Sequence, residues 1–166
     1  MFTSQKTLSK GQKAFQITLI SLILANLIFI FTQSLLPPEI ASAESEAVSD
    51  VIKDFLPAES TAGKFTEDNM DKIAHLIEFG VLGALTSLYV CFFKVSVKKF
   101  FLPLLGFVSA TALFDETIQI FSGRTFDTID ILFDIIGFSI LSIIIFTTYF
   151  CLKWHSVKGK INGQNN

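Results

Sequence analysis

Four long apolar stretches alternate with short charged segments along the chain. They cover residues 16–36, 73–93, 101–121 and 129–150. Each is about 21 residues long, which as a helix matches a hydrocarbon core about 30 Å thick. The stretches lack the alternation of apolar and polar positions that marks the strands of membrane barrels. Because a helix satisfies its own backbone hydrogen bonds, we predict four transmembrane helices.

Residues at the ends of these stretches are typical of helix boundaries. Pro37 and Pro38 stop the first predicted helix, and Gly123 is a candidate C-terminal cap of the third. Asp127 can cap the start of the fourth helix. Pro103 is expected in the first turn of the third helix, where a missing N–H costs little. The pattern predicts an all-α membrane protein with a four-transmembrane-helix bundle.

The segments between the helices fall into two groups by charge. Lysines gather in the tail 1–15, in the loop between the second and third helices, and in the tail 151–166. The long loop 37–72 carries an excess of acidic residues instead. By the positive-inside rule, the lysine-rich segments are cytoplasmic and the acidic loop lies outside. We therefore predict one membrane domain, residues 16–150, with the N and C termini cytoplasmic.

The first apolar stretch also has features of a secretory signal. A basic segment precedes it, and Ala41-Ser42-Ala43 follows it as a possible cleavage site. However, the stretch exceeds the 7–15 apolar residues usual in a signal peptide, and the double proline intervenes. We expect the first helix to stay attached to the mature protein.

Composition supports a membrane location. The chain is 51% hydrophobic, contains 19 Phe residues and has a mean hydropathy of +0.57, which is unusual for a soluble domain. Its basic residues form small clusters beside apolar runs, without the basic stripe of a nucleic-acid-binding surface. We expect the lipid bilayer as a partner and no nucleic acid.

Ionisable residues lie inside the second, third and fourth predicted helices, where they are costly and usually functional. At 1.5 Å per residue, all fall within roughly 10 Å of the outer membrane boundary. Because neighbouring helices run in opposite directions, chance placement would scatter these residues over different depths. Arg124 lies in the turn directly above this layer, where we expect it to contact at least one of the carboxylates. The candidate polar site comprises His75, Glu78, Asp115, Glu116, Gln119, Arg124, Asp130 and Asp134.

Five of these residues are acids, so the predicted cluster must hold protons or a cation. His75 and Glu78, one helical turn apart, are weak candidates for metal ligands, as is Glu116, because such a pair is common in proteins without metal. The chain lacks the His-Glu-x-x-His motif of zinc proteases and the Gly-x-Ser-x-Gly motif of many hydrolases. The sequence therefore indicates no particular cofactor.

Three sequence patches carry a family resemblance. They are Lys72-Ile73-Ala74-His75-Leu76-Ile77-Glu78-Phe79, Asp115-Glu116-x-x-Gln119-x-Phe121-x-Gly123-Arg124, and Asp130-x-x-x-Asp134-x-x-Gly137. With the segment Phe31-Thr32-Gln33-Ser34, they resemble the VanZ-like family of bacterial membrane proteins, which is linked to teicoplanin resistance. The chain has Ile118 where that family commonly has His. The resemblance implies a multi-pass protein of the bacterial cytoplasmic membrane and a lowered sensitivity to glycopeptides, but no known reaction.

Three functions are open on these grounds. We favour an outward-facing polar pocket that binds or handles an envelope component, with Arg124 as the contact for an anion. That component would be a cell-wall precursor, a lipid headgroup or a glycopeptide. The second is an intramembrane acid/base or metal-assisted enzyme, with Asp115 or Glu116 as base and His75 as acid or metal ligand. The third is a purely structural role, in which the polar residues pack the helices together.

Overall fold

The computed structural model describes residues 8–43, 69–93 and 97–162. The described chain forms four long helices, each long and apolar enough to cross a membrane, and contains no strand. This confirms the prediction of an all-α protein with four transmembrane helices. Most of the predicted outer loop, residues 44–68, lies outside the described residues. The helices are α1 (Lys10–Ser34), α4 (Met70–Phe92), α5 (Val97–Phe121) and α6 (Thr128–Asn162).

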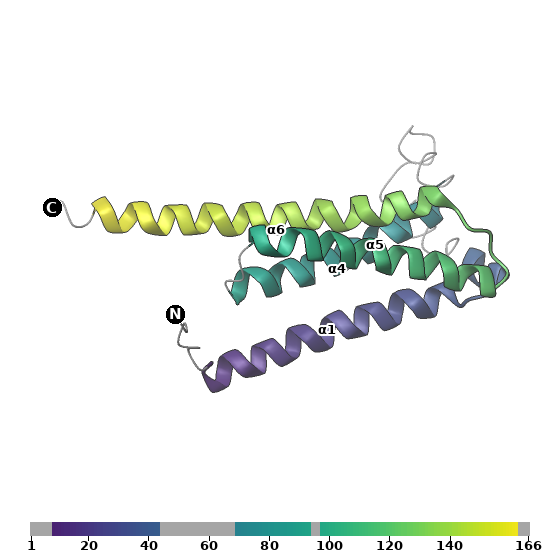
Figure 1. Cartoon of the computed structure of the whole chain (residues 1–166), viewed down its shortest axis with the longest axis horizontal. Helices are drawn as coiled ribbons and strands as arrows, with labels where there is room; N and C mark the ends of the chain where they lie inside the picture. The colour runs from purple at the N-terminus through teal and green to yellow at the C-terminus, as the bar shows by residue number, and fades with distance from the viewer. Residues whose placement is uncertain (1–7, 44–68, 94–96, 163–166) are drawn as a thin grey trace.

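Successive helices run in opposite directions. In Figure 1, α1 and α5 run one way and α4 and α6 run back, so the start of α1 and the end of α6 lie at the same end of the bundle. An even number of crossings requires this arrangement. The orientation of the bundle in the membrane, with both termini cytoplasmic, stays a prediction.

All four helices extend beyond their predicted limits at one end or more, and α1 and α6 do so the most. Helix α1 begins at Lys10 instead of residue 16, because Ser9 and Gln12 form a capping box in which each side chain accepts a hydrogen bond from the other's backbone N–H. Helix α6 continues to Asn162 instead of ending at residue 150. No glycine or proline lies between residues 150 and 158 to stop it.

The predicted position of Pro103 is wrong. Helix α5 begins at Val97 and not at residue 101, so Pro103 lies inside the helix, in its second turn. A proline there removes one intrahelical hydrogen bond. Pro103 also lines an apolar pocket of about 290 Å³ between α1, α4 and α5, which includes Phe100 from the first turn of α5.

The turn between α5 and α6 is built from local capping interactions. Gly123 has a φ of 88°, a conformation that favours glycine, and its N–H donates to the Ile120 carbonyl at 3.2 Å. The Arg124 N–H donates to the Gln119 carbonyl at 3.0 Å, which completes a Schellman motif. The Asp127 carboxylate accepts the N–H of the second residue of α6 at 2.8 Å. Both predicted caps are thus confirmed.

Helices α4 and α6 form the closest pair in the bundle. Gly83 of α4 lies against the backbone of Phe138, and Gly137 of α6 lies against the backbone of Leu76. A Cβ atom at either glycine would overlap the facing backbone. Small residues at such crossings let membrane helices approach closely.

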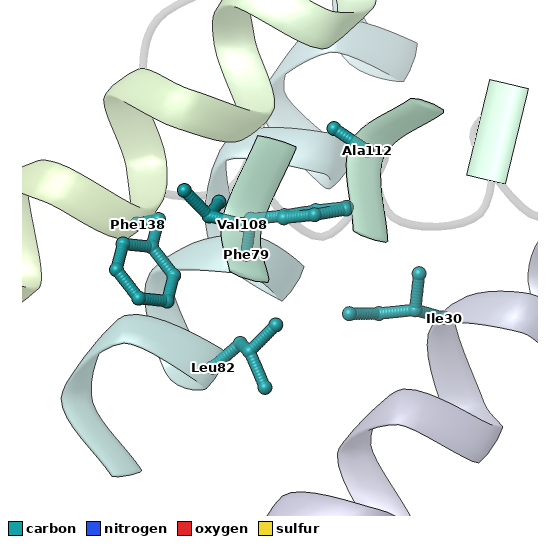
Figure 2. Close-up of a cluster of buried hydrophobic side chains, with 6 residues drawn as sticks. All are labelled: Ile30, Phe79, Leu82, Val108, Ala112 and Phe138. Atoms are coloured by element: carbon teal, nitrogen blue, oxygen red, sulfur yellow. The ribbon is translucent and has the colours of Figure 1, made fainter. Parts of the chain in front are cut away.

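An apolar core joins all four helices, as Figure 2 shows. Its buried side chains are Ile30 of α1, Phe79 and Leu82 of α4, Val108 and Ala112 of α5, and Phe138 of α6. Many apolar side chains point outward instead, and Leu102 and Phe121 are 74% and 83% exposed. A protein with this outer surface is suited to lipid.

Candidate functional site

A buried polar layer lies one helical turn beyond the apolar core. Residues four apart lie on the same face of a helix, so each pair stacks a polar side chain on a core residue. Helices α1 and α5 run toward this layer, so in them the polar residue follows the core residue. Helices α4 and α6 start near the layer, so in them the polar residue comes first. The pairs are Ile30 with Ser34, Phe79 with His75, Ala112 with Glu116, and Phe138 with Asp134.

His75 lies at the centre of this polar layer and is 7% exposed. Its Nδ1 atom lies 2.9 Å from Asp134 Oδ1 and 3.7 Å from Asp115 Oδ2. Its Nε2 atom lies 3.3 Å from the amide nitrogen of Gln119. When Nδ1 carries the proton and donates to Asp134, Nε2 has a free lone pair. Asp134 therefore orients the imidazole and sets its tautomer.

Asp115 has hydrogen-bond donors on both carboxylate oxygens. The Ser34 hydroxyl donates to Oδ1, and the Gln119 amide donates to Oδ2 at 3.1 Å. The Ser122 hydroxyl, from the end of α5, donates to the Ser34 carbonyl at 2.9 Å. These bonds join α1 to α5 at the level of the polar layer.

Ser34 was missing from the predicted site. In the sequence, Ser34 stands out only as the last residue of the segment 31–34 that resembles the family. Its position at the end of the first helix, at the depth of the other polar residues, was the available signal. Serines at helix ends are common, so Ser34 could not be identified as a site residue before its partner, Asp115, was known.

Glu116, Asp130 and Asp134 each keep one buried oxygen that has no hydrogen-bond partner. Glu116 is fully buried; its Oε2 accepts the Asp127 N–H at 2.8 Å, while Oε1 has no donor. Asp130 Oδ1 accepts no hydrogen bond, and the Lys72 ammonium group lies 3.9 Å from it. Oxygens in this state are costly unless something else compensates them.

Glu78 and Arg124 lie at the margin of the polar layer and are half-buried. Within the described part of the chain, neither side chain forms a hydrogen bond or an ion pair. The expected direct contact between Arg124 and a carboxylate is therefore wrong for these residues. Lys72, from the first turn of α4, approaches Asp127 and Asp130 instead, at 3.9 Å from each. The Arg124 guanidinium still lies close enough to interact electrostatically with Glu78 and Asp130.

The structure thus brings together six of the eight predicted site residues as buried neighbours and leaves Glu78 and Arg124 at the margin. Two sets of these side chains have the spacing for a metal ion, with ligand atoms within 4.8 Å of one another. Glu78, one of the weak metal candidates, belongs to neither set. The sets are His75 with Glu116 and Asp130, and His75 with Asp115 and Asp134.

Charge is the main chemical feature of this site. Four carboxyl groups, those of Asp115, Glu116, Asp130 and Asp134, are buried beside one imidazole. Four carboxyl groups cannot all be ionised in one buried cluster unless a cation compensates their charge. Otherwise some of them must be protonated. The arrangement suits proton exchange, cation binding, or hydrogen bonding to a polar group.

The comparison with protein-family models matches residues 2–151 to the family described as VanZ/LLP1. No curated protein and no solved structure matches the chain. The matched residues include α1, α4, α5 and the part of α6 that carries Asp130 and Asp134. The match agrees with the resemblance of the three sequence patches, and the chain belongs to the VanZ/LLP1 family.

Proposed function

We propose that this envelope membrane protein binds an anionic headgroup of an envelope component at the polar end of its bundle, through Arg124. The observation that carries the proposal is the state of the Arg124 side chain. It is half-buried above a buried polar layer, and its guanidinium forms no hydrogen bond or ion pair with the described residues, although it lies within electrostatic reach of Glu78 and Asp130.

The chemistry of arginine favours a phosphate as the bound group. A guanidinium offers five N–H donors in a planar fork that matches two phosphate oxygens at once. Such charge-assisted bonds are stronger than neutral ones. Arg124 lies three residues after the last residue of α5, so an anion there would lie beside the polar layer and outside the apolar core.

The nearby carboxyl groups restrict which anions fit. Glu78 is half-buried within electrostatic reach of Arg124 and would repel a purely anionic ligand when ionised. A headgroup with hydroxyl or ammonium groups next to its phosphate would donate hydrogen bonds to Glu78 while its phosphate contacts Arg124. We therefore propose a phosphate-bearing lipid with a hydroxylated or amine-bearing headgroup, a class that includes lipid-linked cell-wall precursors.

Substitution of Arg124 tests the proposal. The full-length protein is purified in detergent, mixed with phosphatidylglycerol or phosphatidylcholine, and the retained lipid is counted by native mass spectrometry. We expect the wild type to retain the anionic lipid preferentially and Arg124→Ala to lose this preference by about 10-fold, since hydrogen bonds to charged groups contribute about 1.5–3 kcal/mol. Arg124→Lys keeps the charge but not the fork and should be intermediate.

Growth in the presence of teicoplanin provides the cellular measurement. Arg124→Ala should lose any protection that the wild type gives while it still accumulates in the membrane. Lys153→Ala is the matched control, because Lys153 is exposed at the opposite end of α6. If Arg124→Ala disappears from the membrane, the residue has a structural role and the proposal fails. Full protection and unchanged lipid preference would also contradict it.

One observation favours a second candidate, an intramembrane acid/base enzyme. Asp134 holds His75 through Nδ1, which is the arrangement by which a carboxylate orients a catalytic imidazole. Incubation of the purified protein with envelope lipids, followed by mass spectrometry, would detect a product. A product made by the wild type and absent with His75→Gln would support this alternative. No change in lipid mass with the wild type would exclude it for the lipids tested.

A further inference from the structure

We propose that the polar layer contains a binding site for one divalent transition-metal cation, formed by His75, Glu116 and Asp130. The inference goes beyond the proposed function, because a cation at this position needs neither Arg124 nor a bound headgroup.

The three side chains have suitable spacing although they come from three different helices. His75 lies on α4, Glu116 on α5 and Asp130 on α6, and one ligand atom of each lies within 4.8 Å of the other two. Metal–ligand bonds to imidazole and carboxylate are about 2.0–2.2 Å long, so two ligands of one ion lie at most about 4.4 Å apart. Shifts of a few tenths of an ångström would close the site around an ion.

Three buried carboxylate oxygens of the polar layer have no hydrogen-bond partner, and two of them, on Glu116 and Asp130, belong to this set. Glu116 is fully buried and its Oε1 atom has no hydrogen-bond partner; Asp130 is 7% exposed and its Oδ1 atom has none either. Lys72, at 3.9 Å from Asp130 Oδ1, is too far to donate a normal hydrogen bond. A cation between the two oxygens would compensate both.

The hydrogen bond to Asp134 leaves one nitrogen of His75 available to a metal. Asp134 engages Nδ1 at 2.9 Å, so Nε2 is the nitrogen with a lone pair for a metal. Histidines that bind metals commonly donate their other N–H to a carboxylate in this way. The contact from the Gln119 amide to Nε2, at 3.3 Å, is long and would be replaced by the ion.

The second set is largely occupied by hydrogen bonds, with Asp134 Oδ2 as its one carboxylate oxygen without a partner. Both oxygens of Asp115 accept donors, from Ser34 and Gln119, and Asp134 Oδ1 faces His75. A metal in that set would have to displace these bonds. We therefore assign Asp115 and Asp134 to supporting the site and not to binding the ion.

The donor atoms select the class of metal. One imidazole and two carboxylates, without a thiolate, suit Zn²⁺ or Mn²⁺. Three protein ligands leave at least one coordination position for water or another ligand, as in sites where a metal acts on a substrate.

Metal binding to the purified, tag-free, full-length protein tests the inference. The protein is treated with a chelator in detergent, dialysed against Zn²⁺ or Mn²⁺, and analysed by inductively coupled plasma mass spectrometry. We expect about one ion per chain for the wild type. Glu116→Gln and Asp130→Asn should each weaken binding at least 10-fold, and Asp115→Asn should weaken it less than either.

His155→Gln is the matched control for histidine, because the chain has only one other His besides His75. Position 155 lies on α6, about 37 Å along the helix from Asp130 at 1.5 Å per residue. This variant should bind like the wild type. Arg124→Ala should also bind like the wild type, which separates this inference from the proposed lipid site.

Thermal unfolding identifies variants that do not fold and provides a second measurement of metal binding. Added metal should raise the apparent melting temperature of the wild type and of His155→Gln but not of Glu116→Gln or Asp130→Asn, because a ligand of the native state stabilises it. A helical wild-type chain that binds no ion would overturn the proposal, whatever the variants do. Equal binding by the wild type, Glu116→Gln and Asp130→Asn would overturn it too, as would loss of binding in Asp115→Asn alone.

Discussion

At the residue scale, the buried carboxyl groups of the polar layer fall into two kinds. Asp115 has a donor on each oxygen, from Ser34 and Gln119, and so resembles a group that holds helices together. Glu116 and Asp130 each keep an oxygen without a hydrogen bond, as does Asp134, whose other oxygen engages His75. A purely structural network would satisfy its members, because an unsatisfied buried oxygen costs free energy. The difference separates packing residues from candidate binding residues within one cluster.

The hydrogen bond from Ser34 to Asp115 predicts a loss of stability for Ser34→Ala. The substitution removes a donor from a carboxylate that is 1% exposed. We expect the free energy of unfolding to fall by about 1–2 kcal/mol, the range for interhelical bonds in membranes and for buried unsatisfied groups. Thermal unfolding in detergent, followed by circular dichroism, measures the effect.

Ser42→Ala is the matched control for this prediction. The Ser42 hydroxyl also donates a hydrogen bond, to the Glu39 carbonyl, but the residue is exposed. Its substitution should change stability by less than about 0.5 kcal/mol. Equal effects of the two substitutions would show that the Ser34 bond does not hold α1 to α5.

At the scale of the elements, the close approach of α4 and α6 determines where the polar layer forms. Gly83 and Gly137 bring the two backbones into contact on the same faces that carry His75 and Asp134. A wider separation of these helices would move the imidazole away from its carboxylate. The glycines therefore support the site although they take no part in its chemistry.

Two Gly→Ala substitutions should change stability in opposite directions. At Gly83, a methyl group would overlap the Phe138 backbone, which cannot move as a flexible side chain can, so we expect a loss of about 1–3 kcal/mol. Gly106 in α5 has no atom within 4 Å of an added Cβ. There the higher helix propensity of alanine should stabilise the protein by about 0.5–1 kcal/mol.

Thermal unfolding of the two variants in the same detergent checks this difference. Because Gly83→Ala would separate α4 from α6, it should also move His75 away from Asp134. Weakened binding of the proposed metal ion would show this effect. If Gly83→Ala is as stable as Gly106→Ala, the close crossing of α4 and α6 is not required by the fold.

At the scale of the whole molecule, the bundle has an apolar outer surface and a polar layer at one end. The apolar core lies beside this layer and joins all four helices (Figure 2). A cluster at one end is close to the membrane surface, where headgroups and ions can reach it, provided that this end faces outward.

The lysine distribution predicts that the polar end faces outward, with both termini cytoplasmic. Single cysteines at positions 64 and 160, in a background where Cys91 and Cys151 are replaced, are labelled in intact cells with a membrane-impermeant maleimide. We expect labelling at 64 and none at 160 before the cells are lysed. The opposite pattern would reverse the orientation and place the polar layer at the cytoplasmic surface.

Much of this fold follows from local properties of the chain. Length and apolarity of four stretches determined four helices, because the bilayer requires internal backbone hydrogen bonding over a set length. Gly123 and Asp127 were recognisable as caps, because a cap depends on neighbouring residues alone. The helix limits at residues 10 and 162 were missed, because α1 begins before its apolar stretch and α6 continues after its own.

The depth of the ionisable residues was also determined by the sequence, because depth depends only on distance along a helix. Which of them touch was decided by the tertiary structure. Helix rotation and separation, set by Gly83 and Gly137, bring His75 to Asp134, while Arg124 forms no ion pair with a described carboxylate. Ser34 gained its role in the same way, from a partner on another helix. Contacts between helices depend on packing geometry, which no single helix contains in its own sequence.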